Sequence, residues 1–225
     1  MRHSILITFI TSCLFIISPS SAYTVQCSFR TQGFHWITDQ FYICRDEKSI
    51  VYTREDRYVD DVSGTHLTGM TNDQVTGFYT LNTRFHYVPK HAEKFFKNLR
   101  VLAVEDSRLI ELRREDLMPY PNVEYLYFSG NLIEVLEKDL LIGNPRIKGI
   151  AMERNHFRFI HSKIFDGITR NLSFLMMDNA GCVSIQSQSN FATAIATINE
   201  KCSSYDSFTP MLTDLYFAQR YMRMV

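Results

Sequence analysis

Apolar residues recur with a period of 24 or 25 residues along the middle of this 225-residue chain. One copy of the pattern, VEYLYFSGNLIEVL, runs from Val123 to Leu136, with apolar residues at positions 1, 4, 6, 11 and 14 and an asparagine at position 9. The other copies begin at Val75, Leu99, Ile147 and Leu172. A constant period of this length is typical of a solenoid, in which successive coils of the chain stack on one another.

The five copies agree far better than composition explains. Five apolar positions in five copies make 25 sites, and Thr80 is the one site that is not apolar. An apolar fraction of 45% would place apolar residues at about eleven of 25 sites. In order of position, the sites are Val75, Leu99, Val123, Ile147 and Leu172; Phe78, Leu102, Leu126, Ile150 and Leu175; Thr80, Val104, Phe128, Met152 and Met177; Phe85, Leu109, Ile133, Phe157 and Cys182; and Val88, Leu112, Leu136, Ile160 and Ile185.

Strand geometry explains this spacing. Positions 4 and 6 alternate with position 5, so both side chains point to one side of a short strand, toward the interior of the coil. Positions 11 and 14 return along the other side and fill the same interior, as does a position 19 occupied by Leu117, Leu141 and Phe165. One coil cannot bury its apolar face alone, so we expect stacked coils whose strands pair in a parallel sheet.

The asparagine at position 9 has a structural explanation. The chain turns sharply after the strand and leaves buried backbone groups without strand partners, which an inward-pointing amide can satisfy. Asn131 and Asn155 stand there, Ser107 and Thr83 offer a hydroxyl, and Ala180 offers neither. The alternative is that these are ordinary polar turn residues facing solvent.

The N-terminus has the layout of a secretory signal peptide, which we place at residues 1–22. Arg2 and His3 precede an apolar run from Ile5 to Ile17, and small residues end at Ala22. The run is short for a membrane anchor, and no later segment is long and apolar enough to span a bilayer. We therefore expect a secreted, extracellular protein without a membrane span.

Removal of residues 1–22 leaves four cysteines, an even number that in a secreted chain indicates two disulfides. Four cysteines allow three pairings. Pairing neighbours, Cys27 with Cys44 and Cys182 with Cys202, places one disulfide at each end of the repeats and none among them.

Both ends of such a stack need covering, because the core and the sheet edge would otherwise meet water. We expect residues 23–72 to form a β-rich cap clipped by the first disulfide, with Trp36 packed over the first coils; a binding role for Trp36 is the alternative. Residues 187–202 predict a helical cap that starts at Ser189 or Asn190 and carries an apolar side. That side comprises Ala192, Ile195, Ala196 and Ile198. Residues 203–225 predict a further helix docked on this cap; the alternatives are a frayed end and a helix that binds a partner.

The repeats at residues 73–186 resemble the leucine-rich-repeat family. LRVLAVEDSRL, VEYLYFSGNLI and IKGIAMERNHF are close variants of its L-x-x-L-x-L-x-x-N-x-L consensus. The segments VQCSFRTQGFHWITDQFYIC and SGTHLTGMTNDQV resemble the N-terminal module of small secreted leucine-rich-repeat proteins of arthropods. The resemblance implies an α/β repeat fold, a right-handed superhelical solenoid with a parallel sheet on its concave face. It also implies an extracellular protein- or glycan-recognition module, with innate immunity or signalling as its setting.

Other kinds of function find little support. Lys plus Arg and Asp plus Glu both number 24, so no charge imbalance favours nucleic acid as a partner. The chain contains no nucleophile elbow, phosphate-binding loop or zinc-protease motif, and we expect no catalytic residues, cofactor or metal site. Asn171 begins the single N-x-[ST] sequon, Asn171-Leu172-Ser173, and is a candidate glycosylation site.

If positions 4 and 6 face inward, positions 3, 5, 7 and 8 face the concave surface, which is usually the binding face of such stacks. An apolar strip on it would comprise Tyr79, Tyr125, Tyr127, Phe174 and Met176. An acidic row would comprise Glu105, Asp106, Glu153 and Asp178, with Arg154 as the only cation. We therefore expect a partner with an apolar patch bordered by basic groups. The alternative is that tyrosines, which are common on strands, simply cover the sheet.

Two other functions stay open at this stage. A structural extracellular-matrix protein would be marked by an obligate surface for self-association. An enzyme would require a convergent polar pocket in the N-terminal module around His35, His66 or Thr65.

Overall fold

The computed structural model describes residues 23–46, 48–178 and 180–203. The predicted signal segment and almost all of the predicted C-terminal tail lie outside these residues. The strands are β1 (Tyr23–Gly33), β2 (Gln40–Asp46), β3 (Ile50–Val51), β4 (Val59–Ser63), β5 (Gly77–Leu81), β6 (Arg84–Phe85), β7 (Val101–Glu105), β8 (Tyr125–Tyr127), β9 (Val135–Leu136), β10 (Gly149–Ala151), β11 (Phe159–Ile160), β12 (Phe174–Met176) and β13 (Gln186–Ser187). The helices are α1 (Ala92–Phe95), α2 (Arg114–Leu117) and α3 (Phe191–Cys202), with short 3₁₀ turns η1 (Asn72–Gln74) and η2 (Thr169–Asn171).

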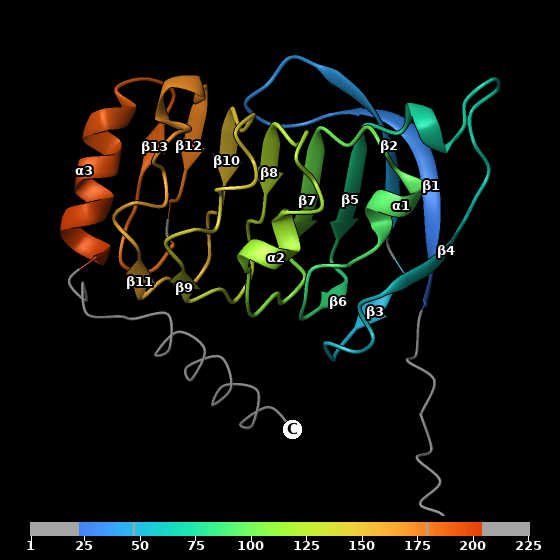
Figure 1. Cartoon of the computed structure of the whole chain (residues 1–225), viewed down its shortest axis with the longest axis horizontal. Coiled ribbons are helices and arrows are strands. Elements are labelled where there is room, and N and C mark those ends of the chain that lie inside the picture. The colour runs from blue at the N-terminus through green and yellow to red at the C-terminus, as the bar shows by residue number, and fades with distance from the viewer. Residues whose placement is uncertain (1–22, 47, 179, 204–225) are drawn as a thin grey trace, which may run out of the picture.

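A nine-stranded sheet runs the length of the described chain in the order β13-β12-β10-β8-β7-β5-β2-β1-β4 (Figure 1). Its strands from β2 to β12 pair in parallel, each with the next repeat. Leu102 lies opposite Phe78 on one side and Leu126 on the other, and Ile150 continues the row. The 24-residue step therefore produces adjoining parallel rungs, as the apolar pattern predicts.

The interior of the coils holds the predicted apolar sites. Of the 25 sites, 23 are buried, and the two exceptions, Cys182 and Ile185 in the last repeat, are partly buried. The position 19 residues Leu117, Leu141 and Phe165 are also buried. Each coil thus covers the apolar side chains of its neighbours, and the interior is one continuous hydrophobic core.

The position 9 side chains Asn131, Asn155 and Ser107 bond to the backbone, as predicted, whereas Thr83 bonds to the hydroxyls of Thr80 and Ser107. The Asn131 amide accepts hydrogen bonds from the N–H groups of Ser107 (3.2 Å) and Leu109 (2.9 Å). Its Nδ2 donates to the carbonyls of Val104 at 2.7 Å and Phe128 at 2.9 Å. Two coils are therefore joined through one buried side chain. Asn155 repeats the arrangement one coil later, and the hydroxyls of Thr83 and Ser107 lie 2.8 Å apart in the preceding coils.

The N-terminal segment contributes a rung to the sheet that the period does not reveal. β2 pairs in parallel with β5, so that Cys44 lies opposite Phe78, and β3 pairs with β6 on the far side of the coil. The step from Cys44 to Phe78 is 34 residues, because 78 − 44 = 34, instead of 24. A search at a fixed period misses this coil, although its geometry matches the coils that follow.

Both predicted disulfides are present, Cys27–Cys44 between β1 and β2 and Cys182–Cys202 between the last repeat and α3. Asn190 precedes α3 as predicted, but it has a left-handed backbone and makes no capping bond through its side chain. The predicted apolar side of this helix is partly wrong. Ala192 and Ala196 are exposed, because the side facing the last coil is instead formed at a spacing of four by Ala194, Ile198 and Cys202.

Candidate protein-binding surface

The loop between β1 and β2, residues 34–39, packs against the face of the sheet predicted to be concave, through Phe34 and Ile37. Phe34 packs on Tyr127 with ring centroids 5.1 Å apart and on Tyr79 at 5.5 Å. The hydroxyl of Tyr127 donates to the carbonyl of His35, and a salt bridge joins Asp39 to Arg100 at 3.4 Å. The loop is thus fixed to the sheet by packing and polar contacts.

A second hydrophobic core forms between this loop and the sheet. The predicted apolar strip belongs to it and is not exposed: its members are Tyr79 (7% exposed), Tyr125 (7%), Tyr127 (2%), Phe174 (0%) and Met176 (1%). The expectation that these side chains face solvent is therefore wrong. The physical reason is that a row of large apolar side chains on a strand surface is stabilised by being covered, and the chain supplies its own cover.

Trp36 is the second correction in this region. It was expected to pack over the first coils, but its side chain is 43% exposed, and Phe34 and Ile37 provide the packing instead. Its backbone is in the left-handed region at φ 72°. The alternative interpretation, a tryptophan available for binding, fits this position.

A hollow of about 380 Å³ remains open where the loop meets the carboxyl ends of β5, β7, β8 and β10. Its lining combines aromatic, apolar and charged side chains from the loop and from four consecutive coils. They are His35, Trp36, Tyr79, Leu81, Glu105, Asp106, Tyr127, Ser129, Ala151, Glu153 and Arg154. This size lies at the lower end of the range for ligand pockets, about 300–1,000 Å³.

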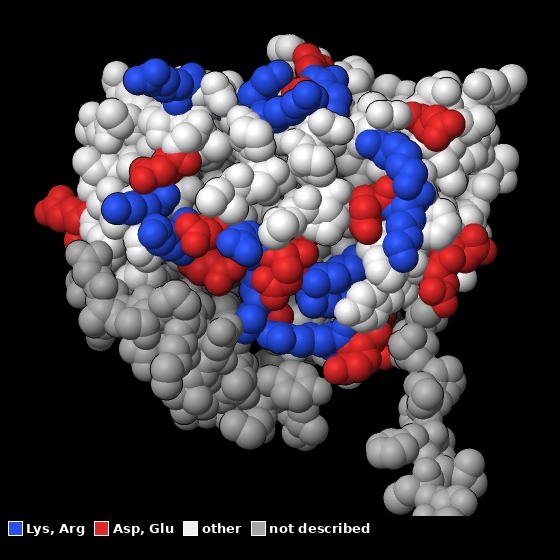
Figure 2. All heavy atoms as spheres, viewed as in Figure 1, with Lys and Arg blue, Asp and Glu red and all other residues white. Residues whose placement is uncertain are grey.

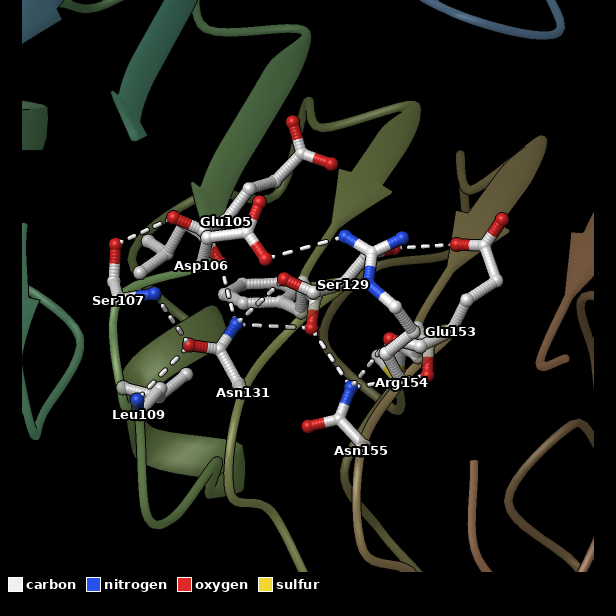
Figure 3. A network of polar contacts seen from close by, with 12 residues as sticks. Glu105, Asp106, Ser107, Leu109, Ser129, Asn131, Glu153, Arg154 and Asn155 are labelled. Carbon is white, nitrogen blue, oxygen red and sulfur yellow. Dashed lines mark hydrogen bonds and ion pairs between the residues drawn. The ribbon is translucent and has the colours of Figure 1, made fainter. Parts of the chain in front are cut away.

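Three members of the predicted acidic row, Glu105, Asp106 and Glu153, line this hollow together with Arg154. Figure 3 shows the polar contacts around them. Arg154 donates to Asp106 at 3.2 Å, and Ser129 donates its hydroxyl hydrogen to Glu153. The Arg154–Asp106 pair spans two coils and passes over Gly130, where an added Cβ would lie 1.8 Å from the Asp106 carboxylate. The structure thus brings together four of the five predicted charged residues. Asp178 is separate and bonds to Ser184 and Gln186 beside β13.

The backbone at position 8 is left-handed in four successive coils. The φ angles are 55° at Asn82, 48° at Asp106, 69° at Gly130 and 52° at Arg154. The first three residue types tolerate this conformation well, whereas arginine does not, at a cost of about 1–2 kcal/mol. Each of the four N–H groups donates to the position 7 carbonyl of the next coil, so this turn holds the wall of the hollow in register.

Glu105 is the most perturbed acid in the hollow. Burial raises the pKa of its carboxyl group to about 7, and the neighbouring Asp106 and Glu153 carboxylates act in the same direction. A hydrogen bond from Tyr79 and the charge of Arg154 lower the pKa only in part. Near neutral pH this side chain is therefore poised between its neutral and charged forms, which makes it sensitive to any charge that enters the hollow.

Outside the hollow, the surface carries side chains of both charges. Figure 2 shows Lys and Arg interspersed with Asp and Glu over the face in view. In the described ranges, no group of three His, Cys, Asp or Glu side chains could hold a metal ion, and no helix could cross a membrane. Asn171 is exposed at the end of η2, with its Nδ2 3.1 Å from the carbonyl of Pro145. Its glycosylation stays a prediction.

The sequence named Trp36 as a binding residue only as the alternative and His35 only for a possible enzyme pocket, and it did not place either beside the sheet. The position 7 residues Leu81 and Ser129 were not among the predicted site residues. The available signal was the stretch FHWI between two cysteine-bearing strands. An aromatic and apolar stretch in a loop needs a surface to cover, and the tyrosines of β5 and β8 provide it.

Among solved structures, the crystal structure of the LRIM1/APL1C complex matches with a TM-score of 0.53 and 17% sequence identity. The match covers 72% of this chain and 27% of that one. The fold is the leucine-rich-repeat fold. A structure of the APL1 leucine-rich-repeat domain has 12% identity and a TM-score of 0.40, with 65% of this chain and 40% of that one covered. The chain therefore spans well under half the length of either protein. No protein-family model matches it, and no curated protein does.

Proposed function

We propose that this leucine-rich-repeat chain is a secreted recognition module that binds an extracellular protein through the hollow between the β1–β2 loop and the concave sheet. The observation that carries the proposal is the exposed Trp36 beside an open cavity on a face whose large apolar side chains are buried. Exposed aromatic side chains next to charged groups are typical of the energetically dominant part of protein interfaces.

Two further features support the proposal. Arg154 keeps a left-handed backbone where asparagine or glycine would be less strained, and such strain persists most often at functional sites. Two disulfides favour an oxidising, extracellular location. Recognition without catalysis, a role in innate immunity or signalling, and caps at both ends of the repeats are parts of this proposal. They draw on the fold shared with the LRIM1/APL1C structure.

The test is affinity capture from the extracellular fluid of the source organism with the full secreted chain as bait, followed by measurement of the dissociation constant. W36A and R154A should each weaken binding of the captured protein by about tenfold or more, as expected for residues that dominate an interface. The matched control is I142A, since Ile142 is 68% exposed and lies outside the hollow. Equal binding by all three variants would contradict the proposal.

The structural alternative, a matrix protein that self-associates, makes a different prediction. Sedimentation of the purified chain would then show concentration-dependent assembly, and capture would return the chain itself. A glycan ligand would be released by glycosidase treatment of the captured material, whereas a protein partner would not.

A further inference from the structure

We propose that the hollow receives an arginine side chain of the partner, with its guanidinium held by Glu105 and Glu153 and stacked on Trp36. This inference rests on the proposed function and specifies the chemistry of the ligand. It is carried by three observations: the charge balance of the lining, the partners of each carboxylate, and the aromatic surfaces around them.

The lining is acidic. It contains three carboxylates, one guanidinium and the imidazole of His35. Its net charge is −2 when the first four groups are ionised and His35 is neutral, since 1 − 3 = −2. The guanidinium belongs to Arg154 and is bonded to Asp106 at 3.2 Å. The two remaining carboxylates, Glu105 and Glu153, are therefore left to attract a cation from outside.

Neither of these two carboxylates has a cationic partner in contact within the described part of the chain. Glu105 lies beside the hydroxyl of Tyr79, which lowers the pKa of its carboxyl group, and Glu153 receives a hydrogen bond from the hydroxyl of Ser129. A hydroxyl is a neutral donor, so it orients a carboxylate without compensating its charge. Both side chains extend from the carboxyl end of the sheet, Glu105 from β7 and Glu153 from the turn after β10, and β8 lies between them (Figure 3). A guanidinium has donors on more than one edge, so it can approach acceptors that come from different coils.

The aromatic surfaces favour guanidinium over ammonium. Tyr79 and Tyr127 line the hollow from the sheet side, and Trp36 is exposed from the loop side. A planar guanidinium stacks on aromatic faces while its edge donates to carboxylates, whereas a lysine ammonium is a compact, strongly hydrated point charge. The volume of about 380 Å³ suits one long side chain better than a folded element.

The raised pKa of Glu105 also favours binding of a cation. Asp106, Glu153, Arg154 and Tyr79 all face Glu105, and the carboxyl group has a pKa of about 7 in their company. A bound guanidinium would favour the ionised form and displace the proton. Binding should therefore strengthen between pH 6 and pH 8, by up to about tenfold if only the ionised form binds.

Trp36 makes the test direct, because it is the single tryptophan of the chain. The fluorescence of the full chain is followed during titration with the tripeptide acetyl-Gly-Arg-Gly-amide. Matched peptides carry lysine or citrulline in place of arginine, and citrulline keeps the shape while removing the charge. We expect a saturable change with arginine at concentrations up to about 50 mM, affinity weaker by about tenfold with lysine, and no saturable change with citrulline.

The variant E105Q/E153Q should reduce the affinity for the arginine peptide by about tenfold or more. E115Q is the control, since the Glu115 side chain is 49% exposed and does not line the hollow. No saturable change with arginine, equal responses to arginine and citrulline, or unchanged affinity in E105Q/E153Q would each overturn the inference.

The inference and the proposed function can fail separately. If a captured protein binds E105Q/E153Q as tightly as the native chain but loses affinity for W36A, arginine recognition is wrong and the hollow is still a binding site. If W36A has no effect on that protein either, both are wrong.

Discussion

Among single residues, Asn131 joins more backbone groups than any other side chain considered above. Replacing it with alanine leaves the N–H groups of Ser107 and Leu109 and the carbonyl of Val104 buried without this partner. Each such group costs about 1–3 kcal/mol, so N131A should lower the free energy of unfolding by at least about 3 kcal/mol. N131S should cost less, because serine occupies the same position naturally at Ser107. Urea unfolding checks both; equal stability of N131A and the native chain would contradict the inward amide.

Glu105 should make stability depend on pH. Its folded pKa of about 7 lies above the ordinary value of 4.5, so the folded chain holds this proton more tightly than the unfolded chain. Its contribution to stability is complete below pH 4.5 and is lost as the pH rises through 7. E105Q keeps the shape without the charge and should therefore be more stable than the native chain at pH 8, by about 1–2 kcal/mol after allowance for partial exposure to solvent.

The measurement for Glu105 is thermal or urea unfolding of the native chain and E105Q at several pH values. The difference between the two should grow from pH 4 to pH 7 and then stay constant. A difference that is independent of pH would mean that Glu105 is not desolvated in the folded protein.

Among the structural elements, the β1–β2 loop has the clearest separate role, because it seals the concave sheet. F34A removes the ring that packs on Tyr127 and Tyr79 without changing the sheet. Amide hydrogen exchange should then increase across residues 33–39, by about tenfold or more, while the repeats from β7 to β12 stay protected. L67A is the control, since Leu67 is 46% exposed in the same N-terminal segment. Unchanged exchange in F34A would show that the ring does not hold the loop.

A second element, the segment 52–59, is joined to the repeats by buried ion pairs. Arg57 lies 2.8 Å from Asp116 at the start of the second repeat's helix, and both side chains are almost fully buried. Burial raises the pKa of Asp116 to about 6 despite the charges of Arg57 and Lys90. R57M should therefore cost about 3 kcal/mol by leaving a buried acid poorly compensated, and R57M/D116L should cost less than R57M alone. A double variant that is less stable than R57M would contradict this account.

At the scale of the whole molecule, the parts that repeat could be predicted and the parts that occur once could not. Leu102, Leu126 and Ile150 were predictable because each coil buries the side chain at the same position. The same apolar position therefore recurs in five copies, and this recurrence identifies it as buried. The disulfides were predictable because four cysteines lie in two well-separated pairs. The loop that covers the sheet occurs once, so no period reveals where Phe34 and Ile37 lie, and the burial of Tyr125 and Tyr127 depends on them.

The charged wall of the hollow could be predicted only in part. The period places Glu105, Asp106, Glu153 and Arg154 on one surface, and the structure brings them together. The left-handed backbone at position 8 was not predicted, although Asn82, Asp106 and Gly130 are residue types that tolerate it and Arg154 alone is not. The hollow itself needs the loop as its second wall. Of the predicted aromatic residues, Tyr79 and Tyr127 line it, whereas Tyr125 and Phe174 do not, and its exposed aromatic side chain is Trp36 of the loop.

The central claim is that the concave sheet is sealed by the chain's own loop and leaves Trp36 beside the hollow as the accessible aromatic group. Hydroxyl-radical labelling of the folded chain, read by mass spectrometry, tests this most directly. We predict strong labelling of Trp36 and of Met118, which are 43% and 50% exposed, and little labelling of Met176, Tyr125 and Phe174. Labelling of Met176 and Tyr125 as readily as Met118 would contradict the account.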